Sequence, residues 1–444
     1  MGPAQCHVFR PERIRDLTAI LGDVGQPHYI ARGLGRSYGD TAVNGGGGVL
    51  NMTRLNRMVQ FDADTGVLEC EAGVSLAEII QVFLPRGFFL PVTPGTKFVT
   101  VGGAIANDVH GKNHHCDGTF SQFVENVTLL TPAGKLLTCS PKKKREVFWA
   151  TAGGIGLTGL IVSARFQLQR VQTAYVSVDY HKSRDLDDAL GTMASSDDRY
   201  QYSVAWVDCL AKGKHLGRSV LMRANHTTPG QLPTALKAVP FPVSGRRTAG
   251  VPFDFPGFVL NPMSIKAFNT CFYGWHDNAE GRIVHYDRYF YPLDGILEWN
   301  RMYGKKGFVQ YQATLPPESV RGLVLLLEKL SASRRASFLA VLKRCGEGNP
   351  GLLSHPIKGY TLTLDIPNHR GLIPFLHELD AILLDHGGRL YLAKDMVAQS
   401  QTIAAMYPRL QAFREIKARL DPENLLSSAM ARRLDLVDHA GRAT

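Results

Sequence analysis

The sequence lacks long apolar runs, paired cysteines and internal repeats, and each absence excludes a class of protein. No stretch reaches the ~18 apolar residues that a membrane-spanning helix needs. Its 7 cysteines include no Cys-x-x-Cys pair, and an odd number cannot be joined completely in disulfides. That usage is typical of reduced thiols in a cytoplasmic protein. Because Arg10, Glu12 and Arg13 interrupt the N-terminal segment, we also expect no signal peptide.

What remains is a globular, basic chain. Its 444 residues predict two or three domains at roughly 100–200 residues each. Apolar residues make up 44% and charged residues 20%, which excludes a disordered or fibrous protein. Lysine and arginine number 50 against 39 acidic residues, so the formal charge is +11. This charge favours an anionic partner, but it does not distinguish nucleic acid, a membrane surface and a phosphorylated metabolite.

The hydrophobic pattern divides the chain. The first part alternates strands and helices in a β–β–α rhythm, and Ser75 with Glu78 forms a capping box that predicts a helix start. Later segments such as 200–207 alternate apolar and polar residues, as strands with one covered face do. We predict an α+β fold with a first domain over 1–172 and a second over 173–388.

Two segments of the second domain carry weaker signals. Residues 225–262 are rich in proline, glycine, threonine and arginine with little periodicity, which predicts a long, mobile excursion. Residues 284–291 are predicted as a strand.

Glycines gather in three groups within the first domain. The groups are Gly33/Gly35/Gly39, Gly95/Gly102/Gly103 and Gly153/Gly154/Gly156/Gly159. Glycine lets backbone N–H groups approach a ligand, and successive N–H groups can bind an anion. The first group lacks the third glycine of a dinucleotide fingerprint, and no Walker lysine follows it. One such group alone would indicate a plain turn, whereas three in one domain favour a cofactor that carries a pyrophosphate.

Three motifs carry a resemblance to a known family. ARGLGRSYGD (31–40), PGTKFVTVGGAIANDVHGKNHH (94–115) and FWATAGGIGLTGLI (148–161) resemble the FAD-binding domain of the vanillyl-alcohol-oxidase-type, or PCMH-type, flavoenzymes. The resemblance continues through SVAWVD (203–208), EWNRMYG (298–304), GFVQYQ (307–312), GGRLYLAKD (387–395) and MARRLDL (430–436). It therefore covers nearly the whole chain. HGKNHH and YLAKD are specific to the branch of the family that oxidises decaprenylphosphoryl-β-D-ribose.

The resemblance implies a two-subdomain FAD-binding domain, completed by the tail 389–444, and a substrate domain built on an antiparallel sheet flanked by helices. The implied FAD-binding residues are Ala31, Arg32, Gly33, Leu34, Gly35, Arg36, Ser37, Tyr38, Gly39, Asp40, Thr41, Gly95, Thr100, Val101, Gly102, Gly103, Asn107, Asp108, Val109, His110, Ile161 and Tyr391. Some sugar oxidases of this fold attach FAD through a histidine in a His-Gly-Ser-Gly context. Here His110 is followed by Gly-Lys-Asn, as in the branch that binds FAD without a covalent bond. The histidines have no cysteine or carboxylate at ligand spacing, so we expect no metal.

Lys394 matches the lysine that the family places at the flavin and the substrate, and Tyr38 is the second catalytic candidate. A lone lysine after a short strand would otherwise be read as a solvated surface residue. Asp395 is a candidate salt partner of Lys394 or a helix cap. The substrate candidates carried over from matching positions are Lys112, Gln310, Gln312, Lys343 and Thr363. The two lysines suit a phosphate, and Trp206 is either pocket wall or core.

Several pocket positions depart from the family pattern. Thr363 stands where mycobacterial members carry a cysteine, Thr361 and Tyr360 replace an asparagine and a tryptophan, and Tyr291 replaces a histidine. These changes put the exact substrate in question, but not the type of reaction. The basic run 142–145 is open to two interpretations, a solvated face or an attraction to membrane phosphates.

The implied activity is FAD-dependent oxidation of a secondary sugar hydroxyl. The resemblance points to the 2′-OH of a polyprenylphosphoryl-β-D-ribofuranose, oxidised to the 2′-keto product in the first half of an epimerisation to the arabinose form. A short-chain reductase partner would complete that epimerisation in cell-wall arabinose synthesis, and the enzyme could associate peripherally with the inner membrane. A soluble alditol or sugar-lactone oxidase is the alternative. A non-enzymatic basic binding protein is a remote one, since the sequence has no helix-turn-helix, zinc or aromatic–basic pattern for nucleic acid.

Overall fold

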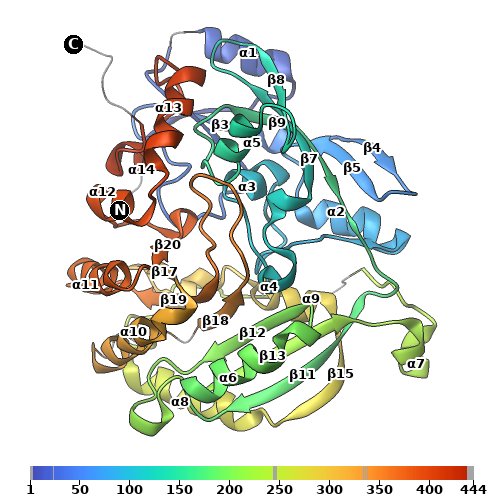
Figure 1. The fold of residues 1–444 in the computed structure, drawn as a ribbon, viewed down its shortest axis with the longest axis vertical. Helices are drawn as coiled ribbons and strands as arrows, with labels where there is room; N and C mark the ends of the chain where they lie inside the picture. Colours follow the sequence, from blue (N-terminus) through green and yellow to red (C-terminus); the bar gives the residue numbers. More distant parts are fainter. Residues whose placement is uncertain are drawn as a thin grey trace.

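The computed structural model describes residues 4–23, 25–243, 248–333, 335, 337 and 339–437. Within these residues three large sheets organise the chain, with helices packed on them (Figure 1). The mixture of helices and mainly antiparallel sheets is the α+β fold that the sequence predicts.

The smallest of the three sheets is parallel and lies in the first part of the chain. Its strand order is β1 (His7–Phe9), β3 (Gly48–Asn51) and β2 (Tyr29–Arg32). Helix α1 (Ile14–Gly22) buries Leu17 and Leu21 against Tyr29 and Leu50 of these strands. Strand β2 leads directly into the glycine loop that begins at Gly33.

The second sheet has five antiparallel strands in the order β4 (Met58–Asp62), β5 (Val67–Glu71), β9 (Leu160–Gln167), β7 (Val124–Leu130) and β8 (Leu136–Cys139). Helices α2 (Leu76–Phe83), α3 (Val101–Ala106) and α5 (Arg145–Thr151) share its core. The predicted capping box is confirmed, because Glu78 N donates to Ser75 Oγ at 3.1 Å and Ser75 N donates to Glu78 Oε2 at 2.7 Å.

The largest sheet is antiparallel and has eight strands. Its order is β15 (Ala279–His285), β11 (Tyr175–Ser183), β13 (Ser219–His226), β12 (Tyr202–Val207), β18 (Ala340–Cys345), β19 (Gly359–Pro367), β17 (Phe308–Leu315) and β20 (Arg389–Leu390). One face packs on α6 (Leu186–Ser196), α10 (Val320–Ser333) and α11 (Leu372–Asp385). Because neighbouring side chains on a strand point to opposite faces, the residues between these core positions face the other way. Ala205 and Leu342 enter the core, for example, while Trp206 and Val341 line a cavity.

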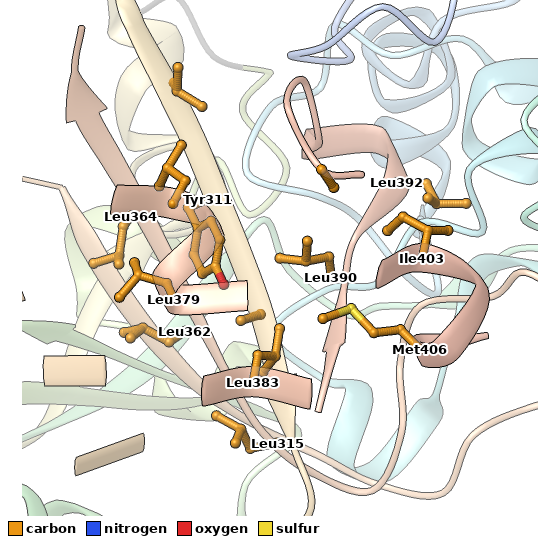
Figure 2. Close-up of a cluster of buried hydrophobic side chains, with 14 of the residues drawn as sticks. Tyr311, Leu315, Leu362, Leu364, Leu379, Leu383, Leu390, Leu392, Ile403 and Met406 are labelled. Carbon is orange, nitrogen blue, oxygen red and sulfur yellow. The ribbon is translucent and has the colours of Figure 1, made fainter. Parts of the chain in front are cut away.

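The C-terminal segment from residue 389, called here the tail, contacts helix α11 on the eight-stranded sheet and also α5 and Val43 from the first part of the chain. Figure 2 shows Leu390, Leu392, Ile403 and Met406 of the tail beside Leu383 of α11. These residues belong to β20, the segment after it and α12 (Ser400–Met406). Farther along, α13 (Leu410–Leu420) contacts α5, and Ala429 N at the start of α14 (Ala429–Arg433) donates to Val43 O at 2.8 Å. The division of the chain at 172 and 389 stays a prediction.

The structure differs from the sequence prediction in one strand and adds helices to a segment without periodicity. The predicted strand 284–291 is wrong beyond His285, because α9 (Tyr286–Phe290) begins there, with the His285 side chain accepting from Asp287 N. The excursion 225–262 contains α7 (Thr234–Lys237) and leads into α8 (Pro262–Trp275), while residues 244–247 lie outside the described part. Among the described residues no helix has the length and apolarity to cross a bilayer.

Candidate functional site

A cavity of about 1820 Å³ lies between the glycine loops that follow β2 and precede α3 and the open face of the eight-stranded sheet. One part of its wall is formed by residues 31–39, 93–96 and 98–100. Another part is polar and comes from β17, β18 and β19, together with the tail residues Tyr391, Ala393 and Lys394. A third part is apolar and comes from β12, α8 and the segments on either side of α8.

The first glycine loop is held close to the neighbouring chain segments. A Cβ on Gly33 would lie 2.2 Å from Thr100 Oγ1, and one on Gly39 would lie 1.7 Å from the carbonyl oxygen of Asp395. Tyr38 N donates to Ala393 O at 3.0 Å. Since no side chain fits at these glycines, the loop lies directly on α3 and on the lysine-bearing tail segment.

Helix α3 forms the next part of the wall. Thr100 Oγ1 accepts from Gly103 N at 3.2 Å and caps the helix, while Gly102 packs against Ala72. At the other end Tyr391 OH donates to Asn107 O at 2.7 Å, so the tail fixes the end of the helix. Asn107 Oδ1 is buried, and no described residue donates to it.

His110 connects the segment after α3 to strand β17. Gln312 Nε2 donates to His110 Nε2 at 2.8 Å, so the proton of the neutral ring lies on Nδ1. Burial lowers the pKa of His110 well below its usual value, with the Lys343 charge adding to the effect. Nδ1 is buried and has no hydrogen-bond partner in the described chain.

Three strands place a polar patch on the cavity. The register pairs Gln310 with Asp365 and Gln312 with Thr363 between β17 and β19, and pairs Lys343 with Thr361 between β18 and β19. Such cross-strand neighbours point to the same face. Gln310 Nε2 donates to Asp365 Oδ1, and Gln312 Nε2 also lies 3.3 Å from Thr361 Oγ1.

Lys394 lies beside this patch. Its Nζ is 3.9 Å from the centre of the Tyr38 ring, within cation–π range. Burial lowers the pKa of Lys394, and the charge of Asp365 opposes that shift. Burial also raises the pKa of Tyr38, so the phenol remains protonated.

Two further lysines reach the cavity. Lys112 Nζ donates to the backbone oxygen of Tyr289 and lies 4.3 Å from the centre of the Tyr289 ring. Burial lowers the pKa of Lys112 to about 7, with Lys343 adding to the effect, and burial also lowers the pKa of Lys343. No carboxylate is paired with either lysine among the described salt bridges.

Most of the candidate residues line this one cavity, including every catalytic and substrate candidate. The exceptions are Asp40, Val101 and Asp108. Val101 is fully buried in the core. Asp108 turns away and accepts from Ser354 Oγ and from Asn349 Nδ2 at 2.6 Å, which ties the β18–β19 loop to the segment after α3.

Asp40 and Asp395 share a partner that sequence reasoning did not assign. Arg433 of α14 binds Asp40 at 2.7 Å and Asp395 at 2.9 Å. Asp395 also accepts from Ala398 N at 2.9 Å, so it caps a turn and pairs with Arg433. The motif that contains Arg433 carried the family resemblance, but an ion pair to residue 40 leaves no local signal in a sequence.

The apolar wall was also missed. It includes Pro252, Val259, Ile265, Phe272 and Met302 beside Trp206. Of the two readings, Trp206 is cavity wall: it is buried on the cavity side of β12, with its ring centre 4.5 Å from that of Phe272. The signal available in the sequence was the density of aromatic residues between 253 and 275, within and beyond a segment that otherwise reads as a loop.

The cavity fits FAD on three observations. Its volume is ample for a dinucleotide, glycines that cannot carry a Cβ form one wall, and Asn107 Oδ1 and His110 Nδ1 are buried polar atoms without partners in the described chain. Among the described residues no group of three His, Cys, Asp or Glu side chains is placed to hold a metal ion.

Comparison with known proteins supports the same cofactor. Residues 6–140 match the FAD binding domain family, and residues 341–434 match the D-arabinono-1,4-lactone oxidase family. An L-gulonolactone oxidase of Bos taurus is 29% identical over 36% of each chain.

Two relatives extend over most of the chain. A protein from the mprA 5′ region of Streptomyces coelicolor, of no stated activity, is 34% identical over 82% of this chain and 100% of its own length. The decaprenylphosphoryl-β-D-ribose oxidase of Mycolicibacterium smegmatis is 39% identical over 96% of this chain and 93% of its own. The chain therefore belongs to the decaprenylphosphoryl-β-D-ribose oxidase family of FAD-dependent oxidoreductases.

Proposed function

We propose that this enzyme oxidises the 2′-OH of a polyprenylphosphoryl-β-D-ribofuranose to the 2′-keto product. The observation that carries the proposal is the composition of this cavity, where three lysines and two glutamines lie near the glycine loops and an apolar wall extends away from them. A sugar phosphate with a long hydrocarbon tail likewise has a polar part, which would suit the lysines and glutamines, and an apolar part, which would suit the apolar wall. The name of the mycobacterial relative supports this substrate class.

We assign the proton transfer to Lys394. Its lowered pKa favours the neutral amine, which can take the hydroxyl proton. The carbon that bears this hydroxyl also loses a hydride, and FAD, when bound, supplies the acceptor for it. The ammonium formed on Lys394 is stabilised by the face of Tyr38 and by the ionised form of Asp365, whose pKa burial raises to about 7.

The remaining roles follow from charge and position. Lys112 and Lys343 are unpaired with carboxylates among the described residues, so a substrate phosphate would restore their charged forms. Gln310 and Gln312 are held by Asp365 and His110, and they orient the sugar hydroxyls. Thr363 faces the same space and sets the room available at that wall.

We propose that FAD is bound without a covalent link. His110 Nε2 is engaged by Gln312, and the low pKa of its ring reflects a buried neutral imidazole. The cofactor would contact the loop 31–41, the segment 100–110, Gly95, Ile161 and Tyr391. Acid precipitation tests this assignment: flavin in the supernatant is expected, and flavin in the pellet would contradict it.

The 2′-keto product needs a second enzyme. Reduction from the opposite face would invert one carbon and give the arabinose form, so we propose a short-chain reductase as the partner. A hydrocarbon-tailed substrate also implies peripheral association with a membrane.

A flavin-bleaching assay tests the substrate. Under anaerobic conditions, polyprenylphosphoryl-ribose is expected to reduce the bound flavin, whereas free ribose and pentitols are not. The match of residues 341–434 to a lactone oxidase family favours a soluble sugar-lactone or alditol oxidase as the second candidate. Rapid bleaching by a pentitol or a lactone precursor, with none by the lipid-linked ribose, would establish that alternative instead.

A further inference from the structure

We infer that the segment around α8 is a docking surface for an anionic lipid bilayer, and that the tail of the substrate passes through it into the cavity. The inference rests on the proposed function, since it names the place where a lipid-linked substrate is collected. It concerns five apolar side chains, called here the apolar lip: Phe253, Phe258, Met263, Trp275 and Leu297.

The apolar lip is exposed to a degree that folding alone does not explain. Met263 is 82% exposed, Trp275 81% and Phe258 75%, while Phe253 and Leu297 are 61% and 51% exposed. Single exposed apolar residues are common on proteins, but a concentration of large ones indicates an interaction surface. All five lie between residues 253 and 297.

The apolar lip borders the cavity. Pro252, Val259 and Ser264 line the cavity wall, and each is followed or preceded by an exposed lip residue. Leu297 belongs to both, because it lines the cavity and is half exposed. Four of the five lip residues therefore lie in the cavity wall or next in sequence to a residue that lines it.

Helix α8 carries two residues of the apolar lip, Met263 and Trp275, and is firmly attached to the rest of the protein. Its Ile265 and Asn269 are buried, and Asn269 Nδ2 donates to Asp208 Oδ1 at 2.7 Å. Tyr273 OH donates to Ser183 O at 3.2 Å, on the same side of the helix. Met263 and Trp275 project from the remaining surface of the helix, near its two ends.

Phe258 is held at the tip of a turn. Val259 N donates to Pro256 O at 2.9 Å, and Asn261 Nδ2 donates to Phe258 O at 2.7 Å. The Asn261 side chain then caps α8 by accepting from Met263 N at 2.8 Å. These hydrogen bonds fix the turn and hold the Phe258 ring in its exposed position.

The charge near the apolar lip favours an anionic bilayer. The exposed basic side chains there are Lys266 on α8, Arg282, Lys305 and Lys306, and the exposed acidic ones are Asp254, Asp277 and Glu280. The balance is a small basic excess, because Glu298 is paired with Arg301 at 2.6 Å. Basic side chains beside apolar ones are typical of surfaces that lie on anionic membranes. The basic run 142–145 lies at the opposite end of the molecule from α8 (Figure 1), so it cannot contact the same bilayer surface.

The holoenzyme with Phe258→Ser, Met263→Ser and Trp275→Ser tests the inference. Sedimentation with vesicles of phosphatidylglycerol and phosphatidylcholine should show at least ~tenfold weaker binding than wild type. The matched control is Val59→Ser with Leu136→Ser, which removes side chains of 60% and 57% exposure from β4 and β8 and should leave binding unchanged. Lys305→Gln with Lys306→Gln should weaken binding to anionic vesicles, and Lys142→Gln with Lys143→Gln should not.

Two substrates separate this inference from the proposed function. The triple variant should oxidise a short-chain geranylphosphoryl-ribose in solution like wild type, yet lose at least ~tenfold in rate on decaprenylphosphoryl-ribose in vesicles. Vesicle binding by the triple variant within twofold of wild type, or an equal loss of binding in the Val59/Leu136 control, would overturn the inference. The apolar lip would then be a candidate contact surface for a protein partner. Failure of wild type to oxidise either ribose would instead refute the proposed function, while the sedimentation result would still decide the docking surface.

Discussion

At the scale of single residues, Lys394 is the side chain on which the proposed chemistry depends. Lys394→Met keeps most of the apolar volume but removes the amine, so flavin content is expected to stay at the wild-type level. The rate of flavin reduction should fall by ~10²–10⁴, the usual contribution of a positioned acid or base. Stopped-flow bleaching with saturating substrate measures this loss.

The pH dependence of the same reaction gives a second measure. Because the neutral amine is the active form, wild-type flavin reduction should rise with pH through the lowered pKa of Lys394 and then level off. Lys394→Arg stays protonated and should remain slow at every pH. A yellow Lys394→Met protein with full activity would refute the assigned role.

Lys112 should reduce the stability of the protein without ligand at neutral pH. Burial lowers its pKa to about 7, well below its usual 10.5. Between these values the unfolded chain binds more protons than the folded one, so this contribution to stability increases as pH rises and is smallest below pH 7. Lys112→Met should therefore raise Tm most at pH 6.5, and the gain should shrink toward pH 9.

Thermal unfolding of the apoprotein at several pH values measures the Lys112 effect, with about 1 °C expected per kcal/mol when all 444 residues unfold together. The exposed Lys142→Met is the control and should leave Tm unchanged across the range. A gain that does not depend on pH would show that Lys112→Met acts through packing alone.

Arg433 is expected to matter for both stability and cofactor affinity. Its removal leaves Asp40 and Asp395, which are 1% and 7% exposed, without their counter-ion. Breaking such a buried pair from one side costs about 3–5 kcal/mol. Arg433→Ala should lower the free energy of unfolding and weaken FAD binding, as measured by flavin fluorescence, and Arg433→Lys should restore part of both. Unchanged FAD affinity in Arg433→Ala would rule out a role in holding the loop.

The sequence predicted the residues of the site better than their contacts. Lys112, Lys343 and Lys394 are far apart in the sequence, and only the family resemblance brought them together before the structure did. Asp108 shows the opposite case, since its motif suggested the cofactor while its carboxylate is used to hold Asn349 and Ser354. Whether a side chain faces the cavity or the core behind it depends on backbone geometry that a motif does not encode.

At the scale of elements, a helix or strand was predicted correctly where residues close together in the sequence determine it. The capping box at Ser75 and Glu78 predicted the start of α2, because both partners lie within one turn. The strand prediction at 284–291 was wrong because alternation over a few apolar residues does not separate a strand from the short α9. Helix α8 was missed because only Ile265 and Asn269 are fully buried, so the helix has a weak apolar stripe.

The glycine loop provides a prediction for one element. In Gly39→Ala the new Cβ would lie 1.7 Å from Asp395 O, so the loop must move away from the segment that bears Lys394. In Gly95→Ala nothing lies within 4 Å of the Cβ, and the methyl group enters the cavity wall. Gly39→Ala should lower both Tm and FAD affinity, whereas Gly95→Ala should leave the Tm of the apoprotein unchanged and reduce FAD affinity alone.

Flavin fluorescence titration and thermal unfolding of the two apoproteins separate these effects. Equal Tm values for Gly39→Ala and wild type would show that the loop does not depend on its contact with the tail. Wild-type FAD affinity in Gly95→Ala would remove Gly95 from the proposed cofactor site.

At the scale of the whole molecule, the cavity requires residues from both ends of the chain, and FAD binding should reflect this. Tyr391 contacts Asn107, Ala393 contacts Tyr38, and both pairs line the cavity. A ligand that binds only the folded form stabilises it by about 2.7 kcal/mol at a hundredfold excess over Kd. Hydrogen exchange with and without FAD should therefore show new protection in 33–39, in 100–110 and also in 391–396. Protection confined to residues before 172 would mean that the tail does not complete the FAD-binding domain, and that Lys394 is positioned by the substrate domain alone.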